Sequence, residues 1–547
     1  MKNMNKLIFR GTMLLAWSLL FACQQQEKAE TLYFNATIYT VDSTFSTVEA
    51  MAIREGKVVA TGSFDELDKQ YVFEQKVDLE GQFVYPGFND AHSHFMGYAQ
   101  SIKAANLYGT HSWEEVLTRV QDFHTKEQGD VIFGRGWDQN HWDVKEFPTR
   151  NELDSLFPNT PVALVRIDGH AWLVNGAALA LSGINGESEI RGGIVKMENG
   201  EPTGLLIDNA ISLLDWPKMP VAQMADLLQQ AEQNLFAAGL TTVCDAGLER
   251  YQIEMLDSLH KAEALKIRVY AMVADEEHLM EYYLKVGPLY TDKLNVRAFK
   301  FYLDGALGSR GALMLAPYAD DSNNVGLQLN SYQHYLEAAK KLEAAGWQMC
   351  AHAIGDSANR LVLDVYSEVL KDKDSRWRVE HAQIVHPKDV LRFGELGVIP
   401  SIQPTHATSD MAWAYERLGA ERMNEAYPYK SLKKSAGVLA LGTDFPVERI
   451  SPILTFYSAV FRMDGDGNPP GGFGPDEMLT REEVLRGMTI DAAYAEFEEH
   501  RKGSLEAGKL ADFVVLDTDL LSAERQKIRN TNVLATYLNG DLVFKAE

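Results

Sequence analysis

The chain has 547 residues, of which 46% are hydrophobic and 24% are charged, an ordinary composition for a globular protein. Its formal net charge of −25 argues against a nucleic-acid partner, because phosphate binding needs a basic surface. Three cysteines far apart in the sequence do not make a disulfide framework, and Cys244 and Cys350 fall in apolar stretches where we expect them to be buried.

Residues 1–22 have the pattern of a secretory signal peptide. Basic residues precede an apolar run at 11–22 that is too short to span a bilayer but suits the core of such a signal. The run ends in LFAC, which resembles a bacterial lipobox, so we expect lipidation of Cys23; ordinary secretion with a chance cysteine is the alternative. We therefore expect a cell-envelope protein that is lipid-anchored to a bacterial membrane, on the outer-membrane or periplasmic side in a Gram-negative cell.

The two ends of the mature chain share one pattern. Residues 31–86 alternate apolar and polar side chains between glycine turns, and residues 500–547 return to that alternation. A period of two predicts short antiparallel strands. We expect one small β-sandwich domain built from both chain ends, with the rest of the chain inserted between its halves.

The middle of the chain, residues 87–460, alternates apolar strands with helical segments. Repeated strand–helix units predict an α/β protein with a parallel sheet. Eight such units predict a closed TIM barrel, whose site lies at the carboxyl ends of the strands. Residues 100–230 are too many for one unit, so we expect an insertion after the first strand, on the catalytic face. The predicted strands are 88–94, 241–247, 266–273, 296–305, 347–356, 377–385, 397–404 and 437–447.

Four of the fourteen histidines stand where a barrel would place metal ligands. His92 and His94 end the first strand, and alternate residues of a strand face the same side. His352 ends the fifth strand, His381 lies in the sixth, and Asp444 ends the eighth. Any one of them alone fits a buried polar residue. Together, four imidazoles and a carboxylate suit zinc or another borderline divalent ion.

Lys300 lies inside the fourth strand between Phe299 and Phe301, where a free ammonium is costly to bury. A buried lysine has a lowered pKa, and a neutral amine reacts with carbon dioxide. The resulting carbamate on Lys300 would be an oxygen ligand able to bridge two metals. The alternative is an ion pair with Asp304 or another carboxylate.

These residues stand in motifs that are specific in combination: PGFNDAHSH, FKFYLDGALGSRGA, CAHAIGD, RVEHAQIVHP, SIQPTHATSD and LGTDFPV. With them the chain resembles the amidohydrolase superfamily and, within it, the YtcJ-like group (the amidohydrolase 3 family). The resemblance covers nearly the whole mature chain. It implies a TIM barrel joined to a β-sandwich, with two divalent metal ions, commonly Zn²⁺.

The resemblance also implies a role for each ligand. His92 and His94 bind the more buried metal, and His352 and His381 the more exposed one. Carboxylated Lys300 bridges the two metals. Asp444 ligates the buried metal and shuttles a proton.

The expected reaction is hydrolysis of a non-peptide C–N bond in a small molecule: an amide, an N-acyl or N-formyl amine, or a cyclic imide. A metal-bridging hydroxide attacks the carbonyl carbon, and Asp444 delivers the proton to the departing nitrogen. The alternatives are an esterase or lactonase using the same metals, or a surface lipoprotein that binds a ligand without cleaving it. A homodimer is the expected assembly.

Six residues outside the metal set are candidates for substrate contact. Three follow barrel strands and three lie in the insertion, which we expect to roof the pocket; packing within loops is the alternative for each. Arg310 would suit a carboxylate on the substrate, with a structural salt bridge as its alternative. The six are His406, Ser309, Arg310, Trp137, Asp138 and His170.

Overall fold

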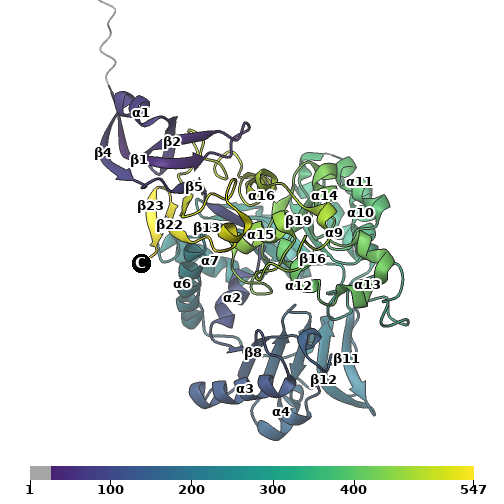
Figure 1. Ribbon diagram of the computed structural model, residues 1–547. Helices are drawn as coiled ribbons and strands as arrows, with labels where there is room; N and C mark the ends of the chain where they lie inside the picture. The colour runs from purple at the N-terminus through teal and green to yellow at the C-terminus, as the bar shows by residue number, and fades with distance from the viewer. Residues whose placement is uncertain (1–25, 372) are drawn as a thin grey trace, which may run out of the picture.

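The computed structural model describes residues 26–371 and 373–547, which form three parts (Figure 1). A barrel occupies the centre, a sheet made from both chain ends lies on one side of it, and an inserted domain lies below it. The predicted signal peptide (residues 1–22) and Cys23 lie outside the described residues. None of the described helices is both long enough and apolar enough to cross a membrane.

Strands from both chain ends share one sheet. The strand β1 pairs with β2 in antiparallel fashion and with β4 and β5 in parallel. The C-terminal strands join the sheet where β21 pairs with β5. The second layer of a sandwich stays a prediction. The helix α1 (Phe64–Gln70) connects β3 to β4. The strands are β1 (Glu27–Tyr39), β2 (Thr47–Arg54), β3 (Lys57–Gly62), β4 (Tyr71–Asp78), β5 (Phe83–Pro86), β21 (Phe513–Leu516), β22 (Val533–Leu538) and β23 (Asp541–Lys545).

The barrel consists of eight parallel strands in chain order, each overlapping a predicted strand, so the predicted α/β TIM barrel is confirmed. The last strand meets the first through two backbone hydrogen bonds of 2.8 Å: Asp444 N–H donates to His92, and His94 N–H donates to Phe445. The strands are β6 (Phe88–Ser93), β13 (Leu240–Leu248), β14 (Arg268–Ala274), β16 (Leu294–Tyr302), β17 (Gln348–Ala353), β18 (Arg378–His381), β19 (Ile399–Ile402) and β20 (Ala440–Leu441).

Buried side chains fill the barrel interior and place both described cysteines, Cys244 and Cys350, in a cluster with Tyr270 and Met272. Both thiols are free and fully buried, as predicted. The inward-facing positions are therefore closely packed, and the polar site is confined to the end of the strands.

Helices surround the strands. The helix α9 begins after Ser331, whose side chain accepts the His334 N–H, and ends at Gly346 in a left-handed conformation. The two helices nearest the C-terminal end of the barrel, α16 and α17, pack against β6 and β20. With them the barrel extends to Ala495, past the expected end at residue 460. The helices are α2 (Phe95–Ser101), α6 (Val221–Ala237), α7 (Arg250–Lys261), α8 (Glu277–Val286), α9 (Tyr332–Ala345), α10 (Asp356–Val369), α11 (Pro387–Leu396), α14 (Tyr429–Ala436), α15 (Pro452–Phe461), α16 (Arg481–Gly487) and α17 (Ile490–Ala495).

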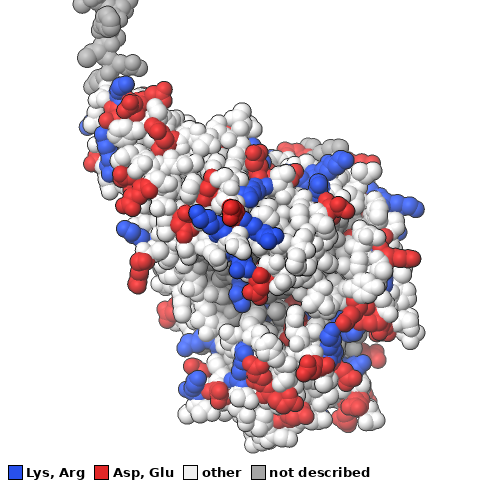
Figure 2. Space-filling view, viewed as in Figure 1, with Lys and Arg blue, Asp and Glu red and all other residues white. Residues whose placement is uncertain are grey.

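The insertion after the first barrel strand is a separate α/β unit with its own hydrophobic core. It is shorter than the expected 100–230, because α2 and α6, which flank it, pack against each other on the barrel. On the face shown in Figure 2, acidic and basic side chains are interspersed. The elements of the insertion are β7 (Ala105–Asn106), α3 (Trp113–Glu127), β8 (Ile132–Trp137), α4 (Asn151–Leu156), β9 (Val162–Arg166), β10 (Ala171–Val174), α5 (Gly176–Leu181), β11 (Gly193–Glu198) and β12 (Glu201–Asp208).

Candidate metal centre

The six predicted metal residues meet at the carboxyl ends of the barrel strands. They come from β6 and the residue that follows it, from β16, β17 and β18, and from the segment that follows β20. All are buried except His94, which is partly exposed. Residues up to 352 positions apart in the chain are thereby brought to one place. The six are His92, His94, Lys300, His352, His381 and Asp444.

The Asp444 carboxylate is surrounded by imidazole nitrogens. Its Oδ1 lies 3.3 Å from Nε2 of His94 and 3.7 Å from Nε2 of His92. Its Oδ2 lies 3.5 Å from Nε2 of His406. Although burial opposes ionisation, the nearby imidazoles of His94, His92 and His406 hold the pKa of Asp444 below its usual value.

The arrangement fits a divalent metal. Asp444 Oδ1 and His406 Nε2 are buried without a hydrogen-bond partner, a state that proteins rarely leave uncompensated. Ligand atoms of His92, His94 and Asp444 lie within 4.8 Å of one another, and so do those of His381, His406 and Asp444. Nitrogen and carboxylate oxygen are the donors that zinc prefers. His406, expected only as a substrate contact, therefore lies within reach of a metal.

A buried ion pair orients His92. Its Nδ1–H donates to Oε2 of Glu380 at 2.5 Å, and Arg378 lies 2.7 Å from the other carboxylate oxygen. Burial alone would raise the pKa of Glu380, but Arg378 and His92 lower it to about 2. The ionised carboxylate keeps the proton on Nδ1, so Nε2 of His92 presents its lone pair to the centre.

Two further histidines are oriented in the same way. His381 donates from Nδ1 to the side-chain oxygen of Gln403 at 2.8 Å, and His94 donates from Nδ1 to the carbonyl of Ala246 at 3.2 Å. Each leaves Nε2 free. Burial lowers the pKa of His381 well below its usual value, so its imidazole is neutral, which is the form that binds a metal.

His352 is turned the other way. Its Nε2 lies 3.5 Å from both the carbonyl of Gly305 and Oδ1 of Asp304, which leaves Nδ1 on the opposite edge of the ring. Its ring centroid is 4.5 Å from that of His381. Burial lowers the pKa of His352 well below its usual value, so this imidazole is neutral too.

Lys300 is fully buried, and its Nζ lies 3.2 Å from Nε2 of His92. Asp304, the alternative ion-pair partner, instead accepts backbone N–H groups of Leu313, Ile354 and Gly355 at 2.8–3.0 Å. Within residues 26–371 and 373–547, no carboxylate forms a salt bridge with this amine. Burial lowers the pKa of Lys300, which favours the neutral amine.

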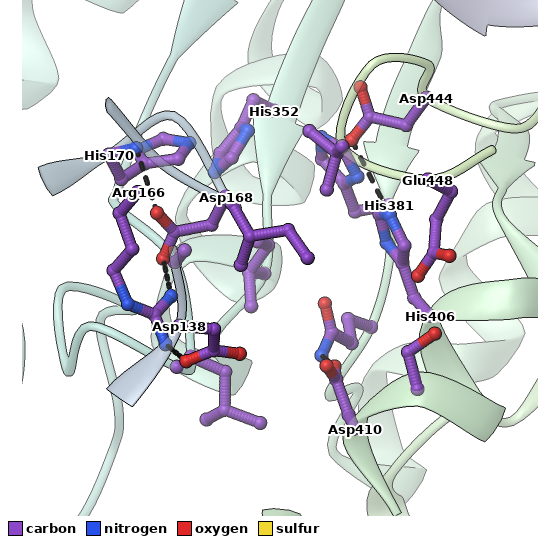
Figure 3. Close-up of a pocket in the computed structure, with 18 of the residues that line it drawn as sticks. Asp138, Arg166, Asp168, His170, His352, His381, His406, Asp410, Asp444 and Glu448 are labelled. Carbon is purple, nitrogen blue, oxygen red and sulfur yellow. Dashed lines mark hydrogen bonds and ion pairs between the residues drawn. The ribbon is translucent and has the colours of Figure 1, made fainter. Parts of the chain in front are cut away.

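The centre opens into a cavity between the barrel and the inserted domain (Figure 3). On the inserted-domain side, the buried Arg166 is paired with both Asp138 and Asp168. The opposite side carries Asp410 and Glu448. Burial raises the pKa of Asp410 to about 7 and that of Glu448 above its usual value.

Of the six candidates for substrate contact, His406, Asp138 and His170 line this cavity; contact with a substrate stays a prediction. His170 donates from Nδ1 to Asp208 at 2.7 Å, and its ring centroid is 5.0 Å from that of His352. The inserted domain therefore reaches the metal centre through His170.

Trp137, Ser309 and Arg310 do not line the cavity. Trp137 points away from it into the core of the inserted domain, where its indole N–H donates to Leu164 at 2.9 Å. Ser309 is buried. Arg310 forms a salt bridge of 2.9 Å with Asp320, the alternative considered for it.

Several residues of the site were not predicted. Glu380 and Gln403 orient ligands, whereas Arg166, Asp168, Asp410 and Glu448 line the cavity. One signal was present: in VRIDGH, Arg166, Asp168 and His170 alternate, as residues on one face of an extended chain do. The charged pair Arg378 and Glu380 inside an apolar strand was a second signal.

Imidazoles, a carboxylate and a buried lysine at the carboxyl ends of a parallel barrel define a metal-dependent hydrolase. The model of the amidohydrolase family matches residues 75–544. The chain belongs to the amidohydrolase family.

Relatives match over nearly the whole chain. Protein LONG AFTER FAR-RED 3 of Arabidopsis thaliana is 35% identical, with 94% of this chain and 92% of that protein covered. The N-substituted formamide deformylase of Arthrobacter pascens is 27% identical, with 94% and 98% covered. The crystal structure of an uncharacterized metal-dependent hydrolase from Pyrococcus horikoshii superposes with a TM-score of 0.74 at 28% identity, over 91% of this chain and 99% of that one.

Proposed function

We propose that the protein hydrolyses a non-peptide C–N bond of a small molecule: an amide, an N-acyl or N-formyl amine, or a cyclic imide. The observation that carries this proposal is the Asp444 carboxylate, set among three imidazole nitrogens and facing a cavity between the barrel and the inserted domain. The name of the Arthrobacter pascens relative adds support for an N-formyl amine.

The residues divide the work between holding metals and moving a proton. Two divalent ions, which we propose to be Zn²⁺, would be held by His92, His94, His352, His381, Asp444 and a carbamate on Lys300. When bound, such ions activate water and polarise a carbonyl oxygen. Asp444 accepts the proton of the attacking water and passes it to the departing nitrogen, which is otherwise a poor leaving group. Asp138, Arg166 and Asp168 form the cavity wall on the side of the inserted domain.

Metal content tests the proposal. The purified protein should contain about two divalent ions per chain, and chelation should abolish cleavage, because both activating positions would be lost. Elemental analysis measures the metal content. A panel of N-formyl amines, N-acyl amines, cyclic imides and lactones measures cleavage with and without chelator. Full activity in protein without tightly bound metal would contradict the proposal, and cleavage of lactones alone would replace amide hydrolysis by ester chemistry.

We also propose that Cys23 carries a lipid anchor, on the basis of the LFAC sequence that ends the apolar run. Replacement Cys23→Ser should move the protein from the membrane to the soluble fraction or leave the signal uncut. Fractionation and N-terminal sequencing check this, with Cys244→Ser, a buried thiol, as the matched control. Wild-type protein that is fully soluble and begins at another residue would contradict the anchor.

A further inference from the structure

We propose that the cavity selects substrates whose amine portion carries a second, positively charged nitrogen, and that Asp410 and Glu448 form the subsite for it. The inference rests on the proposed hydrolysis and names its substrate class: N-formyl or N-acyl derivatives of diamines.

Both carboxylates belong to the cavity that contains the metal centre. Asp410 ends α12 (Pro404–Asp410), and Glu448 follows Asp444 by four residues. They lie across the cavity from Asp138 and Asp168 (Figure 3). The cavity is continuous with the candidate metal centre, because Asp444, with a side chain only 6% exposed and an Oδ1 without a hydrogen-bond partner, also lines it.

The hydrogen bonds of the two carboxyl groups come from neutral side chains, while the charge of His406 acts on both and that of Arg449 on Glu448 without a salt bridge. Asp410 Oδ2 accepts hydrogen bonds from the Gln383 side chain and the Tyr427 hydroxyl, both at 2.8 Å. Glu448 lies beside Ser409. Among the residues that the structure describes, no lysine or arginine forms a salt bridge with either carboxylate. Two buried acids without a cation gain free energy when a cation enters.

The cationic side chains on the cavity wall already have partners: the pKa of His170 is raised by its hydrogen bond to Asp208, which also neutralises its charge. The described residues that line the cavity include one arginine, Arg166, and one lysine, Lys300. Arg166 is already neutralised by two carboxylates, and Lys300 belongs to the metal centre. Arg310, which would suit a substrate carboxylate, is paired with Asp320 outside the cavity. Beyond the metal centre, carboxyl groups therefore outnumber arginine and lysine side chains on the cavity wall, and a cation, which would also favour the ionised form of Asp410 and Glu448, is the complementary ligand.

Three N-formyl compounds of similar length test the preference: N-formylputrescine, N-formyl-n-pentylamine and N-formyl-γ-aminobutyrate. We expect kcat/KM for the cationic compound to exceed that for the neutral one by roughly 10- to 100-fold, the usual worth of a hydrogen-bonded contact to a charged group. The anionic compound should be the poorest substrate. Equal kcat/KM for the cationic and neutral compounds would overturn the inference.

Variants locate the subsite. Asp410→Asn and Glu448→Gln should each reduce the ratio of kcat/KM for the cationic compound to kcat/KM for the neutral compound by about 10-fold. Glu395→Gln, an exposed carboxylate on α11, is the charge-matched control and should keep the preference. A preference that persists in the double variant Asp410→Asn/Glu448→Gln would refute the assignment.

Binding of putrescine, followed by calorimetry, gives a readout independent of turnover. The double variant should bind it at least about 10-fold more weakly with unchanged metal content. If no C–N compound is cleaved, the proposed hydrolysis fails, and the putrescine comparison still decides the subsite. If neutral formamides are cleaved and putrescine binds both proteins equally, only the subsite fails.

Discussion

The variant Asp444→Asn should retain most of its metal while kcat falls by roughly 10²–10⁴-fold, the usual worth of a positioned acid–base group. Asparagine keeps the size and one oxygen of the side chain, so contacts with His92, His94 and His406 survive in outline. It cannot accept a proton. The proposed roles of ligand and shuttle are thereby separated.

The loss is confined to the transition state, so KM should change much less than kcat. The acidic limb of the pH–rate profile should disappear in the same variant, if that limb reports Asp444. Steady-state kinetics on samples of matched metal content measure both effects. Near-normal turnover by a metal-loaded Asn variant would place the shuttle elsewhere. His406, 3.5 Å from the carboxylate, would then be the residue to replace.

Lys300→Ala should release metal and abolish activity. The side chain is fully buried and has no carboxylate partner among the described residues, so a carbamate is the form that its position supports best. Small carboxylic acids should partly restore both metal and activity, because they supply the missing oxygen ligand in the space left by the side chain.

Lys300→Met controls for packing, since it keeps the apolar stem but forms no carbamate. We expect it to lose metal as fully as Lys300→Ala while unfolding at a higher temperature, because it leaves a smaller void. Elemental analysis and thermal unfolding separate the two effects. High-resolution density showing an unmodified amine beside two metals would refute the carbamate, as would a fully metal-loaded Met variant.

The barrel, and the meeting of the six candidate metal ligands at one end of it, were predictable because the signals of each strand are local. Each buried strand is an apolar run of the right length, and the ligands stand at its end, as His92 and His94 do. The order of the strands follows from the short, right-handed connections of such folds. Each strand and the polar residue at its end can be recognised locally, whereas the metal site is predicted only when the candidate ligands of several strands are taken together.

The cavity wall was harder because it depends on packing between distant segments. Glu380 orients His92 across 288 positions of sequence, which no local pattern reveals. Trp137 and Asp138 were equally good candidates, yet adjacent residues of an extended chain face opposite ways, and only Asp138 faces the cavity. The side on which a loop residue lies is decided by the domain packed against it.

The junction where β20 meets β6 has a thermodynamic consequence. Two backbone hydrogen bonds join the strands there, and the candidate ligands His92, His94 and Asp444 flank those bonds. A metal held by residues from both sides would link the first and last strands where the barrel closes. Its binding free energy would then count toward the folded state. Protein without metal should unfold first at this junction. The metal supply would then control the lifetime of the protein as well as its catalytic rate.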